Sequence, residues 1–344
     1  MKLSSCFYAI LLLHVGCLPI VFGQHASVQD QQPYPTIGSV IRYDVALDAI
    51  IDSTATAEII AKGFVWSEGP LWIESEKMLL FSDVPTNTIY KWTAEKGTEI
   101  YLTPSGYTGS EPNHRKEPGS NGLVLDPNGH LVMCQHGNRQ VARMEASLKQ
   151  PHAKFQPLAH QYEGKRLSSP NDAVFNEAGE LFFTDPPYGL PTQRDDDPER
   201  EIAFNGVYRV KQNGDTQLLT DKISKPNGIA FFPNEQKLLI GNSDPHAADW
   251  YILDLTAPII TPKLFYSATN ERTGLKGLPD GLKIDRKGTV YASGPGGVWI
   301  FNGTGKPLGK IALEDAVSNV ALSTDEAILY ITNSDKILRI QLKN

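Results

Sequence analysis

Hydrophobic and polar positions alternate in short runs along most of the chain, and one unit recurs. It consists of an acidic or amide residue, usually followed by Gly or Ala, then an apolar stretch, a turn and a second apolar stretch. The copies begin at Glu68, Asn121, Asn171, Asn227, Asp280 and Asn319. Their intervals are 53, 50, 56, 53 and 39 residues. Runs this short, joined by turns such as Pro-Asn-Gly, indicate β-hairpins, and a period near 50 is typical of propeller blades.

Further strand-like runs follow each hairpin and extend the repeat. Third strands are expected at residues 88–92, 140–144, 206–210, 250–255, 297–301 and 337–342. Fourth strands are expected at residues 99–102, 156–159, 217–219, 264–266 and 309–313. The sixth copy lacks a fourth strand, whereas an unassigned run, 57–61, precedes the first copy. We therefore predict an all-β, six-bladed β-propeller whose last blade is closed by this N-terminal strand, which removes an open edge.

The N-terminal residues differ from the repeats. Lys2 precedes an apolar run at residues 7–15, and cleavage before Gln24 would follow Val-Phe-Gly. This pattern predicts a signal peptide over residues 1–23, with cleavage before Cys17 as a minor alternative. The run is shorter than the roughly 20 apolar residues that a membrane span needs. We therefore expect an exported protein, periplasmic or secreted, with no membrane span.

The composition limits the classes of binding partner and indicates the domain organisation. Of the 344 residues, 40% are hydrophobic and 21% are charged, which suits a globular chain, with a polar leader at 24–40 and one domain at 41–344. The net charge of -7 argues against nucleic-acid binding, which needs clustered Lys and Arg. Without the signal peptide only Cys134 remains, in an apolar run that predicts a packed structural thiol. We expect a small-molecule ligand and no obligate protein partner.

The register of the repeat predicts a candidate site. If the first strand of each blade lines a central channel, the six residues that begin the copies meet at one end of that channel. Two carboxylates and up to four amides, without Cys or paired His, form a set of hard oxygen donors. Such donors favour Ca²⁺ over Zn²⁺, although another divalent metal is compatible. The alternative is that Asn-Gly and Asp-Gly are turn residues, but Glu68 has no turn preference.

Loops at the same end of the channel supply further candidates. The second strand of each hairpin returns to this end, which places His136, Asp185 and Asn242 above the ring; Asp83 and Asn333 share the same offset in other blades. A loop His that satisfies a backbone carbonyl is an equally common role for His136. We expect substrate contacts from Asn121, His136, Asn171, Tyr188 and Asn242.

Five ordered motifs carry a resemblance to a known family. They are SEGPLW at 67–72, SPND at 169–172, TDPPYGL at 184–190, KPNGIA at 225–230 and PDG at 279–281. Together, over roughly residues 63–342, they resemble the gluconolactonase, regucalcin and luciferin-regenerating family of six-bladed propellers.

The resemblance implies a divalent-metal lactonase. Glu68, Asn227 and Asp280 match the family's metal ligands, and Asn171 matches a position that is either a ligand or a substrate contact in relatives. Asp280 is the family's usual base candidate, and Asp185 is a second candidate on the rim. The TDPPYGL segment and residues 135–139 indicate the bacterial gluconolactonase branch.

Lactone chemistry agrees with such a site. Opening the ring needs a Lewis acid on the carbonyl and an activated water, and Ca²⁺ acidifies water so weakly that a carboxylate must act as base. Two alternatives stay open. The same site could hydrolyse other lactones or phosphotriesters, or the chain could be a non-catalytic propeller that binds carbohydrate or another ligand and holds a structural calcium.

Overall fold

The computed structural model describes Met1 and residues 34–343. The predicted signal peptide beyond Met1 and residues 24–33 of the predicted leader lie outside the described residues. Apart from two short 3₁₀ helices, η1 (Val45–Ala49) and η2 (Glu74–Glu76), the regular elements of the described chain are β-strands. Neither of these helices has the length and apolar character that a membrane crossing requires.

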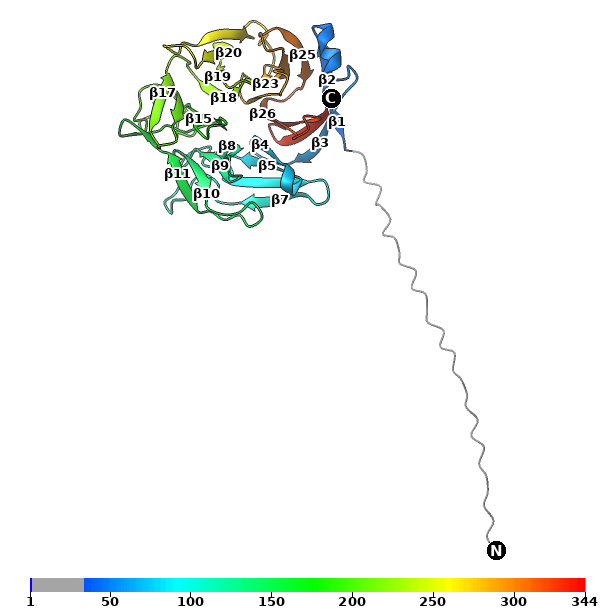
Figure 1. Ribbon diagram of the computed structural model, residues 1–344, viewed down its shortest axis with the longest axis horizontal. Coiled ribbons are helices and arrows are strands. Elements are labelled where there is room, and N and C mark those ends of the chain that lie inside the picture. The colour runs from blue at the N-terminus through cyan, green and yellow to red at the C-terminus, as the bar shows by residue number, and fades with distance from the viewer. Residues whose placement is uncertain (2–33, 344) are drawn as a thin grey trace. The chain divides into compact units, whose positions relative to one another are not determined.

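The strands form six antiparallel sheets, which are the blades of a ring (Figure 1). Blade 1 contains β4 (Ser67–Ile73), β5 (Met78–Asp83), β6 (Thr88–Thr93) and β7 (Gly97–Leu102). Blade 2 contains β8 (Ser120–Leu125), β9 (Leu131–Gln135), β10 (Gln140–Met144) and β11 (Phe155–Ala159). Blade 3 contains β14 (Ala173–Phe175), β15 (Leu181–Asp185), β16 (Gly206–Val210) and β17 (Thr216–Thr220). Blade 4 contains β18 (Pro226–Phe231), β19 (Lys237–Asp244), β20 (Ala247–Asp254) and β21 (Lys263–Ser267). Blade 5 contains β22 (Leu282–Ile284), β23 (Val290–Gly294), β24 (Gly297–Phe301) and β25 (Pro307–Ala312). Blade 6 contains β26 (Val317–Leu322), β27 (Ile328–Asn333) and β28 (Lys336–Gln341), and a small separate hairpin, β12 (Gln161–Tyr162) with β13 (Lys165–Arg166), follows blade 2.

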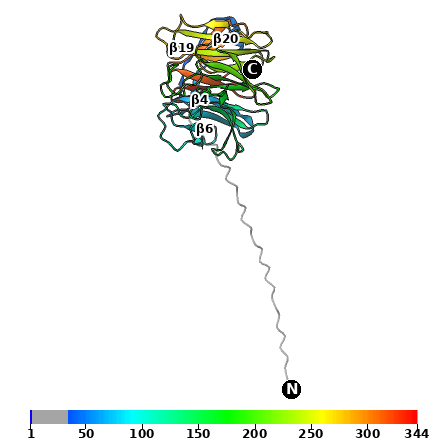
Figure 2. The same cartoon turned by 90° about the vertical axis from the view of Figure 1, so that its left-hand side faces the viewer.

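The predicted six-bladed propeller is confirmed. Figure 1 shows β4, β8, β18 and β26 near the middle of the ring and β7, β11 and β17 at its outside. Blades 1 and 4 lie on opposite sides of the ring, as the labels of β4, β6, β19 and β20 show in Figure 2. The predicted third strands of blades 2, 3 and 5 match β10, β16 and β24 residue for residue. The innermost strand of each blade is the one that begins a copy of the repeat.

Ring closure by an N-terminal strand is also confirmed. β3 (Ala57–Lys62) pairs antiparallel with β28, and Ile59 lies opposite Leu338. The Arg339 guanidinium adds a hydrogen bond of 2.5 Å to the Glu58 carboxylate across this pair. Blade 6 therefore combines strands from both ends of the described chain.

The N-terminal segment contributes more than the predicted closing strand. β1 (Thr36–Ile37) pairs with β3, and β2 (Ser39–Arg42) pairs with β25 of blade 5. The predicted domain start at residue 41 therefore falls inside β2, and the propeller begins several residues earlier. These strands were missed because they are very short and mostly exposed, so they carry no apolar alternation.

Apolar side chains fill the space between neighbouring blades. Between blades 4 and 5, the ring of Trp250 lies 5.2 Å from that of Phe301, and Trp299 stacks on Phe301 at 5.9 Å. All three are buried, so this contact contributes through both area and ring geometry. Cys134 is fully buried in blade 2 as an unpaired thiol, and burial raises its pKa, which agrees with a structural role.

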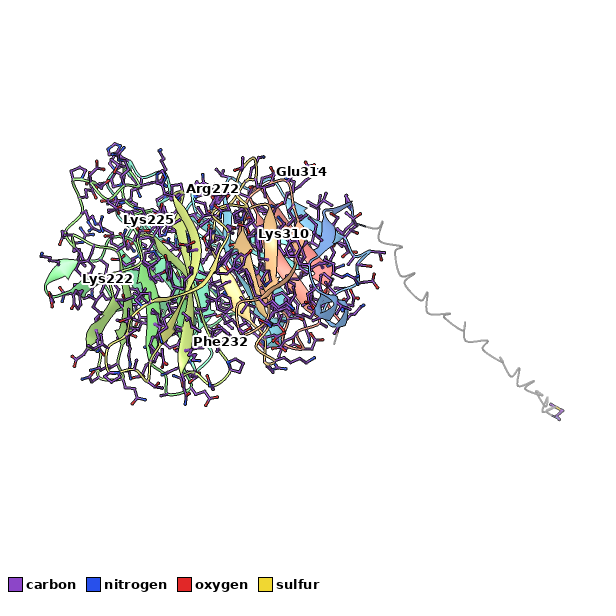
Figure 3. All side chains as sticks on the ribbon, turned by 90° about the horizontal axis from the view of Figure 1, so that it is seen from above. Lys222, Lys225, Phe232, Arg272, Lys310 and Glu314 are labelled. Carbon is purple, nitrogen blue, oxygen red and sulfur yellow. The ribbon has the colours of Figure 1, made fainter. Side chains whose placement is uncertain are left out.

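The two faces of the ring differ in which strand ends they expose. Lys225, Arg272 and Glu314 precede innermost strands and lie in the upper half of the molecule in Figure 3. Phe232 follows β18 and lies in the lower half. We call the first side, where the innermost strands begin, the mouth face.

Candidate active site

A cavity of about 300 Å³ lies at the mouth face, around the start of the innermost strands. It is lined by Trp66, Glu68, Glu117, Asn121, Asn171, Tyr188, Asn227, Ser243, Gly277, Leu278, Asp280, Ala316 and Val317. Five of the six residues that begin the repeats are therefore brought together, as the register predicts. The sixth, Asn319, does not line the cavity, and its Oδ1 accepts the backbone N–H of Val320 at 2.8 Å.

Glycine follows most of these residues because neighbouring blades touch there. A Cβ on Gly69 would lie 2.1 Å from the carbonyl oxygen of Asn121, and one on Gly228 would lie 2.2 Å from that of Asp280. A Cβ on Gly122 would lie 2.7 Å from the carbonyl oxygen of Asn171 in the next blade, which is also too close. These glycines permit close approach of backbones inside strands. The interpretation of the Asn-Gly pairs as simple turn residues is therefore wrong for blades 2 and 4.

Glu68 and Asp280 are two buried carboxylates in one cavity. Glu68 is 3% exposed, and burial, reinforced by the charges of Asp172 and Glu117, raises its pKa to about 8. Burial and then the charge of Glu68 raise the pKa of Asp280 well above its ordinary value. Asp280 Oδ1 is buried without a hydrogen-bond partner in the described chain, and none of the largest influences on the pKa of either group comes from a basic side chain. The pair therefore has no close counter-charge among the described residues.

The amide side chains complete an oxygen-rich wall. Asn227 Nδ2 donates to Ser243 Oγ at 3.0 Å, and Ser243 Oγ donates to the carbonyl of Pro279 at 2.5 Å. This chain of hydrogen bonds ties Asn227 to the segment that carries Asp280. Asn121 Oδ1 is buried and has no hydrogen-bond partner among the described residues.

This donor set fits a hard divalent cation. Glu68, Asn171, Asn227 and Asp280 offer two carboxylates and two amide oxygens, which Ca²⁺ accepts together with water. Within residues 34–343, no group of three His, Cys, Asp or Glu side chains is close enough to hold a metal. Amide oxygens would therefore have to take part in any metal site at the mouth of the channel.

Asp185 does not lie on the rim, and that prediction is wrong. Its side chain is fully buried, and the backbone N–H groups of Ser168 and Ser169 donate to its two carboxylate oxygens at 2.8 and 2.7 Å. Burial raises its pKa to about 6, against the opposing effect of these two bonds. Asp185 holds the segment that leads into Asn171 and does not face the cavity.

Asn242 plays the same part in blade 4, so the predicted substrate contact is also wrong. It is 1% exposed, its Oδ1 accepts the N–H of Lys225 at 2.8 Å, and its Nδ2 donates to the carbonyl of Ala247 at 2.9 Å. Asp83 accepts the N–H of Trp66 at 3.0 Å in blade 1. Residues at the end of the second strand therefore fix the loop that leads into the inner strand of the same blade.

His136 and Tyr188 have different surroundings. Tyr188 lines the cavity, its OH donates to the carbonyl of Ser243 at 3.0 Å, and burial raises its pKa, so the phenol keeps its proton. His136 is fully buried behind the wall, and burial lowers its pKa to about 3, so the ring is neutral. Its Nδ1 lies 3.6 Å from Glu117 Oε2. The predicted direct substrate contact of His136 is wrong because Glu117 stands on the cavity wall instead.

Glu117 is the acidic group that sequence reasoning missed. It lies in the connection between β7 and β8, outside the repeated hairpins, and it lines the cavity. Burial raises its pKa to about 7. The available signal was its position four residues before Asn121, in the run Glu-Pro-Gly-Ser-Asn.

The described chain is a closed six-bladed propeller with buried carboxylates and amides at one mouth of its channel, and this combination can be compared with known families. Residues 66–335 match the family described as SMP-30/Gluconolactonase/LRE-like region, and the chain belongs to this family. It is 35% identical to the gluconolactonase of Zymomonas mobilis, an alignment that covers 100% of this chain and 98% of that protein.

Solved structures agree with the family assignment. A gluconolactonase from Xanthomonas campestris is 27% identical, with a TM-score of 0.75 over 91% of this chain and 99% of that chain. Regucalcin from Agrobacterium tumefaciens, a calcium-binding protein, is 14% identical, with a TM-score of 0.62 over 90% of this chain and 96% of that chain. At that identity the second comparison supports the fold alone.

Proposed function

We propose that the protein is a metal-dependent lactonase that opens sugar lactones such as glucono-1,5-lactone, with Ca²⁺ as the first candidate metal. The observation that carries the proposal is the buried pair Glu68 and Asp280, which shares a cavity with Asn171 and Asn227 and lacks a counter-charge. Membership of a gluconolactonase-like hydrolase family supports the substrate class. We also propose export to the periplasm or medium, which detection of a mature N-terminus at Gln24 by mass spectrometry would support.

The cavity suits a monosaccharide lactone. Its volume of about 300 Å³ lies at the small end of ligand pockets, which run from roughly 300 to 1,000 Å³. Trp66 and Leu278 supply apolar wall, while Asn121 and Tyr188 place polar groups where sugar hydroxyls would lie. A small polyhydroxylated ring fits this mixture better than a long polymer does.

The reaction adds water to the lactone carbonyl carbon and breaks the bond from that carbon to the ring oxygen. A divalent cation held by Glu68, Asn171, Asn227 and Asp280 would polarise the carbonyl. A carboxylate accepts the proton of the attacking water, and a proton is delivered to the departing ring oxygen. The product is an aldonic acid, which releases one proton at neutral pH and so makes turnover measurable as acid release.

The test joins metal binding to turnover. Acid release from glucono-1,5-lactone is followed in a pH-stat, above the spontaneous rate, with Ca²⁺ and after chelation. Glu68→Gln and Asp280→Asn should lose both calcium binding and activity, while Glu95→Gln, an exposed carboxylate of blade 1, should lose neither.

Two alternative functions correspond to other outcomes. Calcium binding without turnover of any sugar lactone would favour a binding propeller with a structural ion. Turnover of another lactone or a phosphotriester, with the same loss in Glu68→Gln, would keep the site and change the substrate. Chelator-resistant turnover with full activity in Glu68→Gln would contradict the metal site.

A further inference from the structure

The cavity holds a third carboxylate that the metal site does not use. Glu117 lies on the wall with Glu68 and Asp280 and is partly open to the cavity, its side chain being 22% exposed. The three carboxylates are near enough for the charge of Glu117 to raise the pKa of the other two. Among the described residues, the three carboxylates do not together form a metal-ligand group. Glu117 also lies outside the repeat that supplies Glu68 and Asp280, so the proposed metal site leaves it unassigned.

The segment that carries Glu117 is held firmly from both sides. The backbone N–H of His136 donates to the carbonyl of Gly119 at 3.1 Å, and that of Gly137 donates to the carbonyl of Pro118 at 3.2 Å. Gly119 N–H in turn donates to the carbonyl of Val84 at 2.9 Å. These bonds fix the turn that follows Glu117 against blades 1 and 2. A side chain carried by a backbone fixed in this way suits a catalytic position, because the backbone needs little reorganisation when the reaction occurs.

His136 packs behind the Glu117 carboxylate. Its Nδ1 lies 3.6 Å from Glu117 Oε2, and the imidazole is packed so tightly that a Cβ on Gly189 would lie 2.5 Å from the Cβ of His136. The ring is neutral, so it neither neutralises the carboxylate nor competes for the substrate. Gln193 adds a hydrogen bond to the Glu117 carboxylate and Lys116 a weak positive charge.

The chemistry needs a base that is not already bound to the metal. A carboxylate that ligates a cation is a weaker proton acceptor, because its negative charge is neutralised by the metal. Asp280 would therefore be a poor base while it ligates the metal. Asp185 cannot relieve it, because both of its oxygens accept backbone N–H groups away from the cavity. Among the described residues that line the cavity, Glu117 is the carboxylate left for this task.

We propose that Glu117 is the general base of lactone opening, and that His136, whose ring packs behind this carboxylate without a hydrogen bond to it, is a positioning residue that limits its movement away from the cavity. Glu117 takes the proton of the water whose oxygen bonds to the carbonyl carbon. It returns that proton to the ring oxygen as the carbon–oxygen bond of the lactone breaks, so the carboxylate is regenerated. This inference rests on the proposed lactonase function. The pKa of Glu117, which burial raises to about 7, agrees with this role, because a general base works best when its pKa is near the working pH.

The test compares Glu117→Gln with Glu111→Gln, an exposed glutamate in the same connection. Glu117→Gln should bind Ca²⁺ with unchanged stoichiometry by calorimetry, lower kcat about 10²- to 10⁴-fold and leave KM within a few-fold. It should also remove the acidic limb of the kcat–pH profile. Glu117→Ala should regain part of its kcat on addition of formate, which a structural role would not produce. His136→Gln should shift that limb without removing it, and Glu111→Gln should behave as wild type.

The outcomes separate this inference from the proposed function. No lactone turnover by the wild type would overturn the proposed function and this inference with it. A chelator-sensitive wild type with Glu117→Gln retaining kcat and an unchanged pH profile would overturn the assignment of Glu117 alone. Loss of calcium binding in folded Glu117→Gln would make it part of the metal site and equally overturn its role as a separate base.

Discussion

Gly228 in blade 4 is in direct contact with Asp280 in blade 5. The N–H of Gly228 donates to the carbonyl oxygen of Asp280 at 3.1 Å, and a Cβ on Gly228 would lie only 2.2 Å from that oxygen. The contact links Asn227, which immediately precedes Gly228, to Asp280 through a single hydrogen bond. Together with the hydrogen bonds through Ser243, this close contact at a glycine with an ordinary backbone conformation helps to set the distance between two of the proposed metal ligands.

Replacing this glycine should separate the ligands. Gly228→Ala is expected to lower the free energy of unfolding by about 1–3 kcal/mol, as overpacking does, and to weaken calcium binding because the Asp280 backbone must move. Gly303→Ala is the control, since its Cβ would meet the nearest atom, a carbonyl oxygen, at 3.4 Å. Urea unfolding and calcium titration check the two effects, and equal results for both variants would contradict this account.

The fold was predictable because its signal is local and repeated. Each hairpin is marked by turn residues and β-branched or aromatic runs, and the count of strands per copy exposed the incomplete last blade. β1 and β2 were not predictable, because strands of two and four residues owe their existence to the blade edges on which they lie. Their pairing is a tertiary effect that overrides weak local preference.

The site was predictable only where it follows the repeat. Glu68 and Asp280 begin copies and reach the cavity together. Asp185 and Asn242 also follow the repeat, but side chains alternate along a strand, and theirs turn back to the backbone of the preceding loop. Glu117 lies in a connection that no period describes, so only the folded chain shows that it faces the cavity.

Asp185 should prove to be a structural residue with a counterpart in blade 1. Asp185→Asn replaces one oxygen that accepts a backbone N–H by an amide that cannot accept it, so the free energy of unfolding should fall by about 1–3 kcal/mol. Asp83→Asn should lower stability less, because Asp83 Oδ1 accepts the N–H groups of Val65 and Trp66 and an asparagine oxygen can still accept both. Chemical unfolding and kcat of the folded protein separate stability from catalysis. A 100-fold fall in kcat without loss of stability would return Asp185 to the list of base candidates.

The N-terminal strands should be essential to the ring. A chain that begins at Tyr34 retains every strand described here and should unfold as the full-length protein does. A chain that begins at Gly63 loses β3, exposes the edge of β28 and removes the buried side chains of Leu47 and Ile51. We expect this shorter chain to aggregate, because an unpaired strand edge is a template for association. Size-exclusion chromatography and thermal unfolding compare the two, and a monomeric, cooperative 63–344 chain would show that closure is dispensable.

The stability of the metal-free protein should fall with rising pH, and calcium should reverse the trend. Folding raises the pKa of Glu68 from its ordinary value of 4.5 to about 8, so the folded state holds this proton where the unfolded chain has released it. The stabilisation is complete below pH 4.5 and is lost as the pH rises through about 8, with a slope of at most about 1.4 kcal/mol per pH unit for one group. His136 acts in the opposite sense, since its lowered pKa costs stability only below its ordinary value of 6.5, so the window from pH 7.5 to 9 excludes it. Near the upper end of this window the buried Cys134 thiol, whose pKa is also raised, acts in the same direction as the carboxylates. In that window, thermal unfolding with chelator should show a falling midpoint, and the increase in midpoint on adding Ca²⁺ should grow with pH because the metal binds the ionised ligands.

Glu68→Gln should flatten both dependences, whereas Glu95→Gln should preserve them. A calcium effect that is independent of pH would mean that the cation binds elsewhere than at this buried pair.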